Sequence, residues 1–158
     1  MKTSHSEDAM ADEHIYTECR KTKDRVGVVL IELCWVDEDR YIFQWTFSDE
    51  WTRFEFHSAL IRSRTMLQVL KHSVSIVLDL RTGMAPDNLL TLAQQGFAAL
   101  NCQVEQVIIV GYLPTWKSLY SILKYTMDDL VIPVKFVATL RQVKGHLNAY
   151  RHDSSSNR

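Results

Sequence analysis

Residues 73–80 read SVSIVLDL, a nearly continuous run of β-branched and aliphatic side chains. Such a run is typical of a strand that is buried on both faces, as the strands of a parallel sheet are. Residues 104–110 and 131–137 form two more runs of this kind. Between the runs lie helical apolar patterns that begin near Pro86 and Pro114, since proline suits a first helical position. The middle of the chain therefore predicts strands that alternate with helices, and hence a mostly parallel sheet.

The residues before this region predict an antiparallel hairpin and one further helix. Residues 26–36 form a strand candidate, and residues 41–47 alternate between large aromatic side chains and the side chains of Ile, Gln and Thr. This alternation is typical of strands. Thr52 and Glu55 have the spacing of a capping box, in which each side chain reaches the other's backbone N–H. The helix that they open is expected to bury a stripe at Phe56, Ala59, Leu60, Ser63, Met66, Leu67 and Leu70.

Three further features complete the expected order of elements. A turn is predicted at residues 81–83, directly after the central strand. The next helix is expected to point Leu89, Ala93, Phe97 and Leu100 inward. Thr139 and Gln142 form a second capping box, for a last helix toward Tyr150.

We therefore predict one α/β domain over residues 25–150. It has an N-terminal β-hairpin, three βα units, a mixed and mostly parallel five-stranded sheet, and about four helices. Residues 1–24 and 151–158 are polar and lack a periodic apolar pattern. We interpret both ends as flexible tails, because they cannot bury enough apolar surface to offset the entropy cost of ordering.

Composition excludes several classes of protein. The chain has 158 residues, 18 Lys+Arg and 19 Asp+Glu, and its five glycines are scattered, so no phosphate-binding glycine loop can be written. No apolar run is long enough to span a bilayer, and the polar N-terminus lacks a secretory h-region. The three cysteines imply neither a disulfide framework nor a zinc clip. We interpret Cys34 and Cys102 as small buried hydrophobic residues and expect a reducing, cytoplasmic location.

The order of elements resembles the STAS domain, the fold of the anti-sigma-factor antagonists, and more closely the uncharacterised STAS-like proteins of bacteria. Four motifs carry the resemblance: WTRFEF at 51–56, VLDLR at 77–81, Val-Gly at 110–111 and FVATL at 136–140. The similarity covers residues 26–147. It implies a small, non-enzymatic regulatory or protein-interaction domain.

In the antagonist branch, the resemblance implies a phosphorylated Ser or Thr at the start of the second helix. Residues 84–88 (MAPDN) stand in that place and contain no hydroxyl. Asp87 falls near the switch position, where it would act as a fixed negative charge at a helix N-terminus. The nearest hydroxyl is that of Thr82. The usual phospho-acceptor is therefore expected to be absent.

A candidate ligand site lies at the carboxyl ends of the central strands. In open α/β sheets, ligands bind outside such ends. Arg81 and Thr82 follow one strand, Tyr112 and Thr115 the next, and together they could hold a small ligand or an anion. In the simpler interpretation, Asp79 and Arg81 satisfy backbone groups of the loop, and Thr82 only turns the chain.

Our first functional hypothesis is a protein-interaction module that binds through its helices, with a homodimer as one form of it. A basic strip late in the first helix, at Arg62, Arg64, Lys71 and His72, could meet an acidic partner. The alternative is a small-molecule or lipid sensor that uses the rim. We expect no enzyme activity, cofactor or metal, because no nucleophile–base pair, carboxylate pair or metal-ligand spacing is visible. The near-zero net charge favours neither nucleic acid nor insertion into a membrane.

Overall fold

The protein is a mixed five-stranded sheet covered by helices, as expected. The computed structural model describes residues 30–84, 87–100, 103–111, 114–126 and 132–156. The sheet order is β1-β2-β3-β4-β5; β1 and β2 are antiparallel and every other pair is parallel. The strands are β1 (Ile31–Trp35), β2 (Ile42–Glu50), β3 (Val74–Met84), β4 (Val104–Val110) and β5 (Val134–Val137). The helices are α2 (Arg53–Gln68), α3 (Leu89–Leu100), α4 (Pro114–Thr126) and α5 (Leu140–Ser156).

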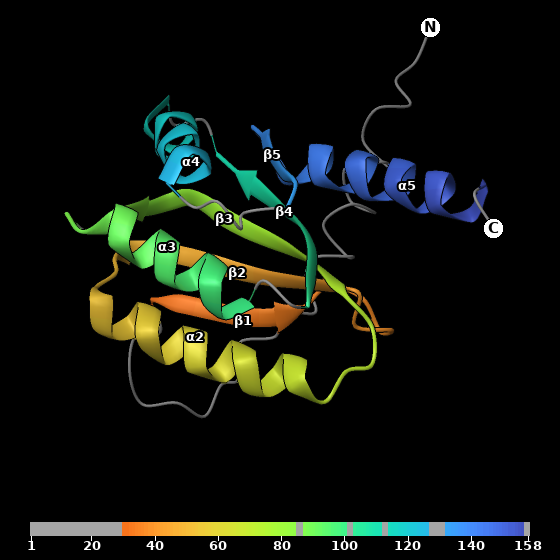
Figure 1. Ribbon diagram of the computed structural model, residues 1–158, viewed down its shortest axis with the longest axis horizontal. Helices are drawn as coiled ribbons and strands as arrows, with labels where there is room; N and C mark the ends of the chain where they lie inside the picture. Colours follow the sequence, from red (N-terminus) through yellow and green to blue (C-terminus); the bar gives the residue numbers. More distant parts are fainter. Residues whose placement is uncertain (1–29, 85–86, 101–102, 112–113, 127–131, 157–158) are drawn as a thin grey trace, which may run out of the picture.

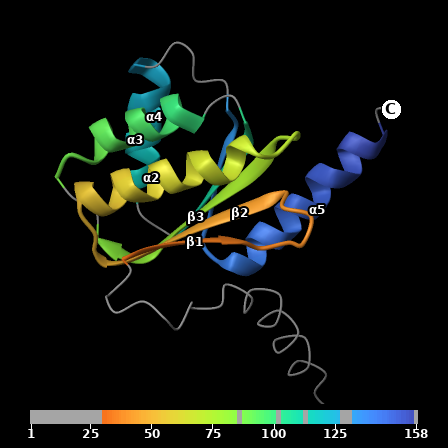
Figure 2. The ribbon, with the colours of Figure 1, turned by 90° about the horizontal axis from the view of Figure 1, so that it is seen from below.

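The strand order explains where the helices lie. From β2 onward each new parallel strand is added at the same edge, and crossovers between parallel strands are right-handed. The connecting helices α2, α3 and α4 therefore share one face of the sheet. The last helix, α5, lies on the opposite face (Figures 1 and 2).

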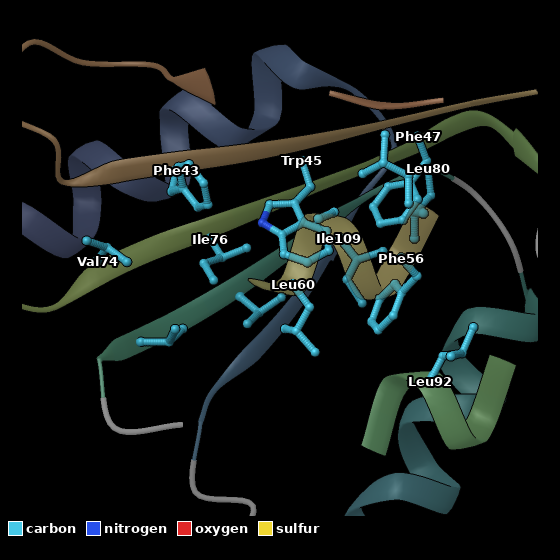
Figure 3. Packing of buried hydrophobic residues seen from close by; sticks show 14 of the residues in the cluster. Phe43, Trp45, Phe47, Phe56, Leu60, Val74, Ile76, Leu80, Leu92 and Ile109 are labelled. Carbon is cyan, nitrogen blue, oxygen red and sulfur yellow. The ribbon is translucent and has the colours of Figure 1, made fainter. Parts of the chain in front are cut away.

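Each face has its own apolar core. The larger core lies under α2 and α3 and contains the hairpin side chains Phe43, Trp45 and Phe47 (Figure 3), whereas Tyr41 is exposed. The smaller core joins Val77, Ile108 and Val110 of the sheet to Val143 and Leu147 of α5. The predicted stripe of α2 is confirmed at Phe56, Ala59, Leu60, Ser63 and Leu67, which are buried.

One hairpin turn and two capping boxes stabilise the ends of these elements. In the hairpin turn, the Asp37 carboxylate accepts hydrogen bonds from the backbone N–H of Tyr41 (3.1 Å) and of Ile42 (2.8 Å). At the start of α2, the Thr52 N–H donates to Glu55 Oε2 at 2.8 Å. At the start of α5, the Thr139 N–H donates to Gln142 Oε1 at 3.3 Å. Both capping boxes are thus confirmed.

The turn predicted at residues 81–83 is wrong. β3 continues to Met84, because β2 also continues three residues beyond its predicted end at Phe47 and offers a partner. After an irregularity between Thr46 and Ser48, pairing resumes with Ser48 opposite Thr82 and with Glu50 opposite Met84. A bulge of this kind bends the strand without ending it.

Three other boundaries differ from the prediction. α3 begins at Leu89, later than expected, and Pro86 lies outside the described residues. β5 begins at Val134 because Pro133 precedes it and has no N–H to give to the ladder. α5 runs to Ser156, six residues past the predicted end at Tyr150 and into the stretch interpreted as a tail. The tail predicted at residues 1–24 and the first residues of the strand predicted at 26–36 lie outside the described part of the chain.

The interpretation of Cys34 as a small buried hydrophobic residue is wrong, because the residue is only half-buried. Cys34 lies on β1 and is disulfide-bonded; the other two cysteines lie outside the described residues. Disulfides persist in oxidising compartments, so this bond does not support the reducing location expected from the cysteine count. Within the described ranges, none of the helices is both long and apolar enough to cross a bilayer.

Candidate functional site: the strand rim, an apolar cavity and the outer face of α2

β4 ends at Val110, opposite Asp79 of β3, whereas β3 itself continues to Met84. Gly111 follows β4 with a φ of +125°, a conformation that residues with a side chain rarely adopt. A Cβ atom at Gly111 would lie 3.4 Å from the backbone nitrogen of Arg81. The N–H of Gly111 donates to the carbonyl of Val137 at 2.9 Å. The glycine therefore lets the end of β4 lie close to the backbone of Leu80 and Arg81 in β3 and to the end of β5.

Asp79 and Arg81 form an ion pair at this rim. Arg81 donates to the Asp79 carboxylate from Nε (2.9 Å), from Nη2 (2.8 Å) and from its backbone N–H (3.3 Å). The Asp79 side chain is 6 % exposed and that of Arg81 46 % exposed. The hydrogen bonds and charge of Asp79 raise the pKa of Arg81, against a smaller opposing effect of burial. The buried carboxylate thus has a fixed cationic partner, and one side of the guanidinium is already occupied.

The other predicted rim residues do not join this pair among the described contacts. The Thr82 hydroxyl donates to the carbonyl of Phe47 at 3.1 Å, across to β2. Asp87 is exposed in the turn two residues before α3 begins. Tyr112 lies outside the described residues, and the side chain of Thr115, the second residue of α4, is not described. A ligand site formed by Arg81, Thr82, Tyr112 and Thr115 stays a prediction, as does a switch role for Asp87.

Sequence reasoning missed a row of buried polar side chains in the sheet. The Gln106 amide donates to the Ser75 hydroxyl at 3.0 Å, and this hydroxyl donates to Glu105 at 3.0 Å. The Gln44 amide donates to the Thr46 hydroxyl at 3.1 Å. Gln44, Ser75 and Gln106 are buried. The alternation of Gln44 and Thr46 with aromatic residues was the available signal for a second, more polar sheet face.

An apolar cavity of about 100 Å³ lies between the sheet and helices α3 and α4. All four α3 residues that were predicted to point inward line it, namely Leu89, Ala93, Phe97 and Leu100. Gly96 lines it too, on the same helix. The sequence signal for this space was the presence of two small residues, Ala93 and Gly96, on the inward face of α3.

The outer face of α2 exposes a row of large apolar side chains. Phe54, Ile61 and Val69 are 80 %, 66 % and 71 % exposed. Residues seven or eight positions apart lie on the same face of a helix, so these three form one surface, which we call the α2 outer face. Exposed Arg53 and Arg64 stand along one side of it. Sequence reasoning identified the buried stripe of α2 and missed this opposite face, although the spacing of the three apolar residues places them on one side of a helix.

The predicted basic strip is only partly available on the surface. Arg62 donates to the carbonyl of Ile31 at 3.4 Å, and His72 stacks on Tyr41 with ring centroids 4.1 Å apart. Arg64 and Lys71 are exposed. Among the described residues, no group of three or more His, Cys, Asp or Glu side chains is arranged to hold a metal ion.

Comparison with known proteins identifies no relative of this chain. No model of a known protein family matches the chain, and no curated protein matches its sequence.

Proposed function

We propose that this chain is a non-enzymatic, STAS-like protein-interaction module that docks a partner on the α2 outer face. The observation that carries the proposal is the exposure of Phe54 and Ile61 on α2 and of Val69 at its C-terminal cap. Single exposed apolar residues need no explanation, but large apolar side chains that recur on one face of a helix give a partner several anchor points. The opposite side of α2 is anchored in the larger core, so this surface is held rigidly in place (Figure 2).

Charge indicates what kind of protein would fit. Arg53 and Arg64 flank the apolar row, and Glu55 is engaged in the capping box with Thr52. A partner with an apolar strip beside acidic side chains would complement both features. A second copy that packed antiparallel on α2 would bring the same arginines face to face, which is unfavourable. We therefore favour a different protein over a homodimer.

The rim supports the alternative, a small-molecule sensor, less directly. Asp79 already occupies two donors of Arg81, and Thr82 donates to the backbone of β2. A ligand anion would have to use the remaining exposed side of the guanidinium. The α2 outer face needs no such rearrangement.

The proposal is tested by affinity purification from cells of the organism that encodes the chain. The full chain is compared with a double variant, Phe54→Glu with Ile61→Glu, and with the matched control Ile122→Glu, which changes an exposed apolar residue on α4. We expect a stoichiometric partner that wild type and Ile122→Glu retain and that the double variant loses. Thermal unfolding checks that all three proteins are folded.

Salt and stoichiometry complete this test. Added salt should weaken the complex, because part of the attraction comes from exposed charges that salt screens. Capture of the same proteins by wild type and by the folded double variant would refute docking on the α2 outer face. A dimer of the purified chain that the double variant abolishes would replace the acidic partner with a second copy.

A further inference from the structure

We propose that the apolar cavity between the sheet and helices α3 and α4 binds a hydrocarbon group of about six carbons, either a ring or the end of an alkyl chain. This inference does not rest on the proposed docking function. It concerns the face of the sheet under the helices, away from both the rim ion pair and the outer face of α2.

The chemistry of the cavity wall sets the class of ligand. The lining side chains are aliphatic or aromatic, and the described lining residues include no charged group. Of the side chains described in the wall, those of Trp45, Trp51 and Tyr120 are the ones that carry a polar atom. The two indole nitrogens are themselves buried by neighbouring atoms, so they offer little surface to a ligand. Water would find few partners here, and genuinely apolar cavities stay dry.

The size of the cavity sets the size of the ligand. A dry cavity of roughly 150 Å³ accepts benzene in a well-studied case, and the cavity here has a volume of about 100 Å³. Since this volume is about two thirds of the other, the end of an alkyl chain fits with the least movement of the wall, and a six-carbon ring needs a small outward movement of the wall. Trp45, Phe56 and Ile109 point into the space between the sheet and the helices, where flat rings can pack against them (Figure 3).

The helix that closes the cavity has small residues where it faces the space. Ala93 and Gly96 lie on the inner side of α3, and a Cβ atom at Gly96 would lie 3.2 Å from the ring of Phe56. The contact between α3 and α4 includes a long hydrogen bond of 3.4 Å between Gln94 Nε2 and Thr126 Oγ1. The cavity is partly open, so entry of a ligand needs no separation of the two helices.

The proposal is tested with fluorobenzene and sodium octanoate, titrated into the full chain and followed by fluorine NMR for the first and by tryptophan fluorescence for both. We expect saturable binding at one site for at least one probe. Fluorobenzene alone indicates a ring ligand, and octanoate indicates an alkyl end; both outcomes support the hydrocarbon site. If neither probe bound saturably, the proposed hydrocarbon site would be refuted.

Two variants of α3 locate the binding. Ala93→Leu fills the cavity and should weaken binding about tenfold or more, which corresponds to about 1.4 kcal/mol. Ala98→Leu makes the same change at an exposed position of the same helix and should leave the affinity within about twofold. Equal affinity of the two folded variants would place the ligand elsewhere and refute the site.

A matched pair of ligands tests the chemical class. Methylenecyclohexane and cyclohexanone have nearly the same shape, but only the ketone carries a hydrogen-bond acceptor. Competition against the bound probe should show that the hydrocarbon binds more tightly, because the wall is mostly apolar and its two buried indole N–H groups cannot replace the water that the carbonyl loses. Tighter binding of cyclohexanone would contradict the hydrocarbon assignment.

Discussion

Replacement of Arg81 by methionine is expected to destabilise the protein more than replacement of both members of its ion pair. Arg81→Met keeps an unbranched side chain of similar reach but removes the guanidinium. Of its hydrogen bonds to described residues, the Asp79 carboxylate, 6 % exposed, would then keep the 3.3 Å bond from the backbone N–H at residue 81 and lose the two from the guanidinium. A buried charge that loses its partner is strongly unfavourable.

The magnitude follows from the two side-chain hydrogen bonds, of 2.9 and 2.8 Å, and from the exposure of the pair. Breaking a fully buried pair costs about 3–5 kcal/mol. Arg81 is half-exposed, so water can reach part of the site, and we expect about 2–4 kcal/mol for Arg81→Met. The double variant Asp79→Asn with Arg81→Met leaves no buried charge, and we expect it to lose about 1–2 kcal/mol.

Urea denaturation at neutral pH, followed by circular dichroism, measures both values. The midpoints give the stability difference as long as the dependence on urea concentration is unchanged. Asp79→Asn alone completes a double-mutant cycle that isolates the coupling between the two residues. If Arg81→Met lost less than about 1 kcal/mol, or no more than the double variant, Asp79 would not depend on Arg81 and the reasoning would be refuted.

Three other predictions follow from the described contacts, and each can be checked by denaturation. Gly111→Ala should destabilise the protein by about 1–3 kcal/mol, because alanine is strained at a φ of +125°. Gly145→Ala in α5, where a Cβ atom meets nothing within 4 Å, should instead stabilise it by about 0.5–1 kcal/mol. Stability changes of the same sign in both variants would contradict this reasoning. The hydrogen bond from Thr52 lowers the pKa of Glu55 below 4.5. The folded state thus binds this proton less readily than the unfolded state. Wild type should therefore have a higher free energy of unfolding than Glu55→Gln above about pH 4.5, and this difference should disappear as the pH falls through the lowered pKa. A stability difference that grew on acidification would refute the lowered pKa of Glu55. Ala93→Leu should raise stability by up to about 2 kcal/mol, at about 24 cal/mol per Å³ for a cavity of about 100 Å³. A loss of stability would mean that neighbouring side chains already occupy the space.

The sequence was informative where one local pattern decides the structure. Residues 104–110 match β4 at both ends, because a continuous apolar run leaves little choice of register. The capping residues Thr52 and Thr139 marked where α2 and α5 begin. In each case the stabilising contacts are close in sequence.

The errors arose where the outcome depends on distant residues. Arg81, Thr82 and Gly83 have the composition of a turn, but they extend β3 because β2 provides a pairing partner. The disulfide of Cys34 and the cavity under α3 depend on the meeting of segments that no local spacing records. The rim was placed correctly at Gly111, yet the pairing of Asp79 with Arg81 needed side-chain geometry.

The most direct test of docking on the α2 outer face is site-specific photo-crosslinking in cells of the organism that encodes the chain. A benzophenone amino acid is placed at Ile61 on α2 and, as the control, at Tyr125 on α4, which is also highly exposed. We expect a discrete adduct with one protein from position 61 and none of that product from position 125. The same adduct from both positions, or none from position 61, would contradict the central claim.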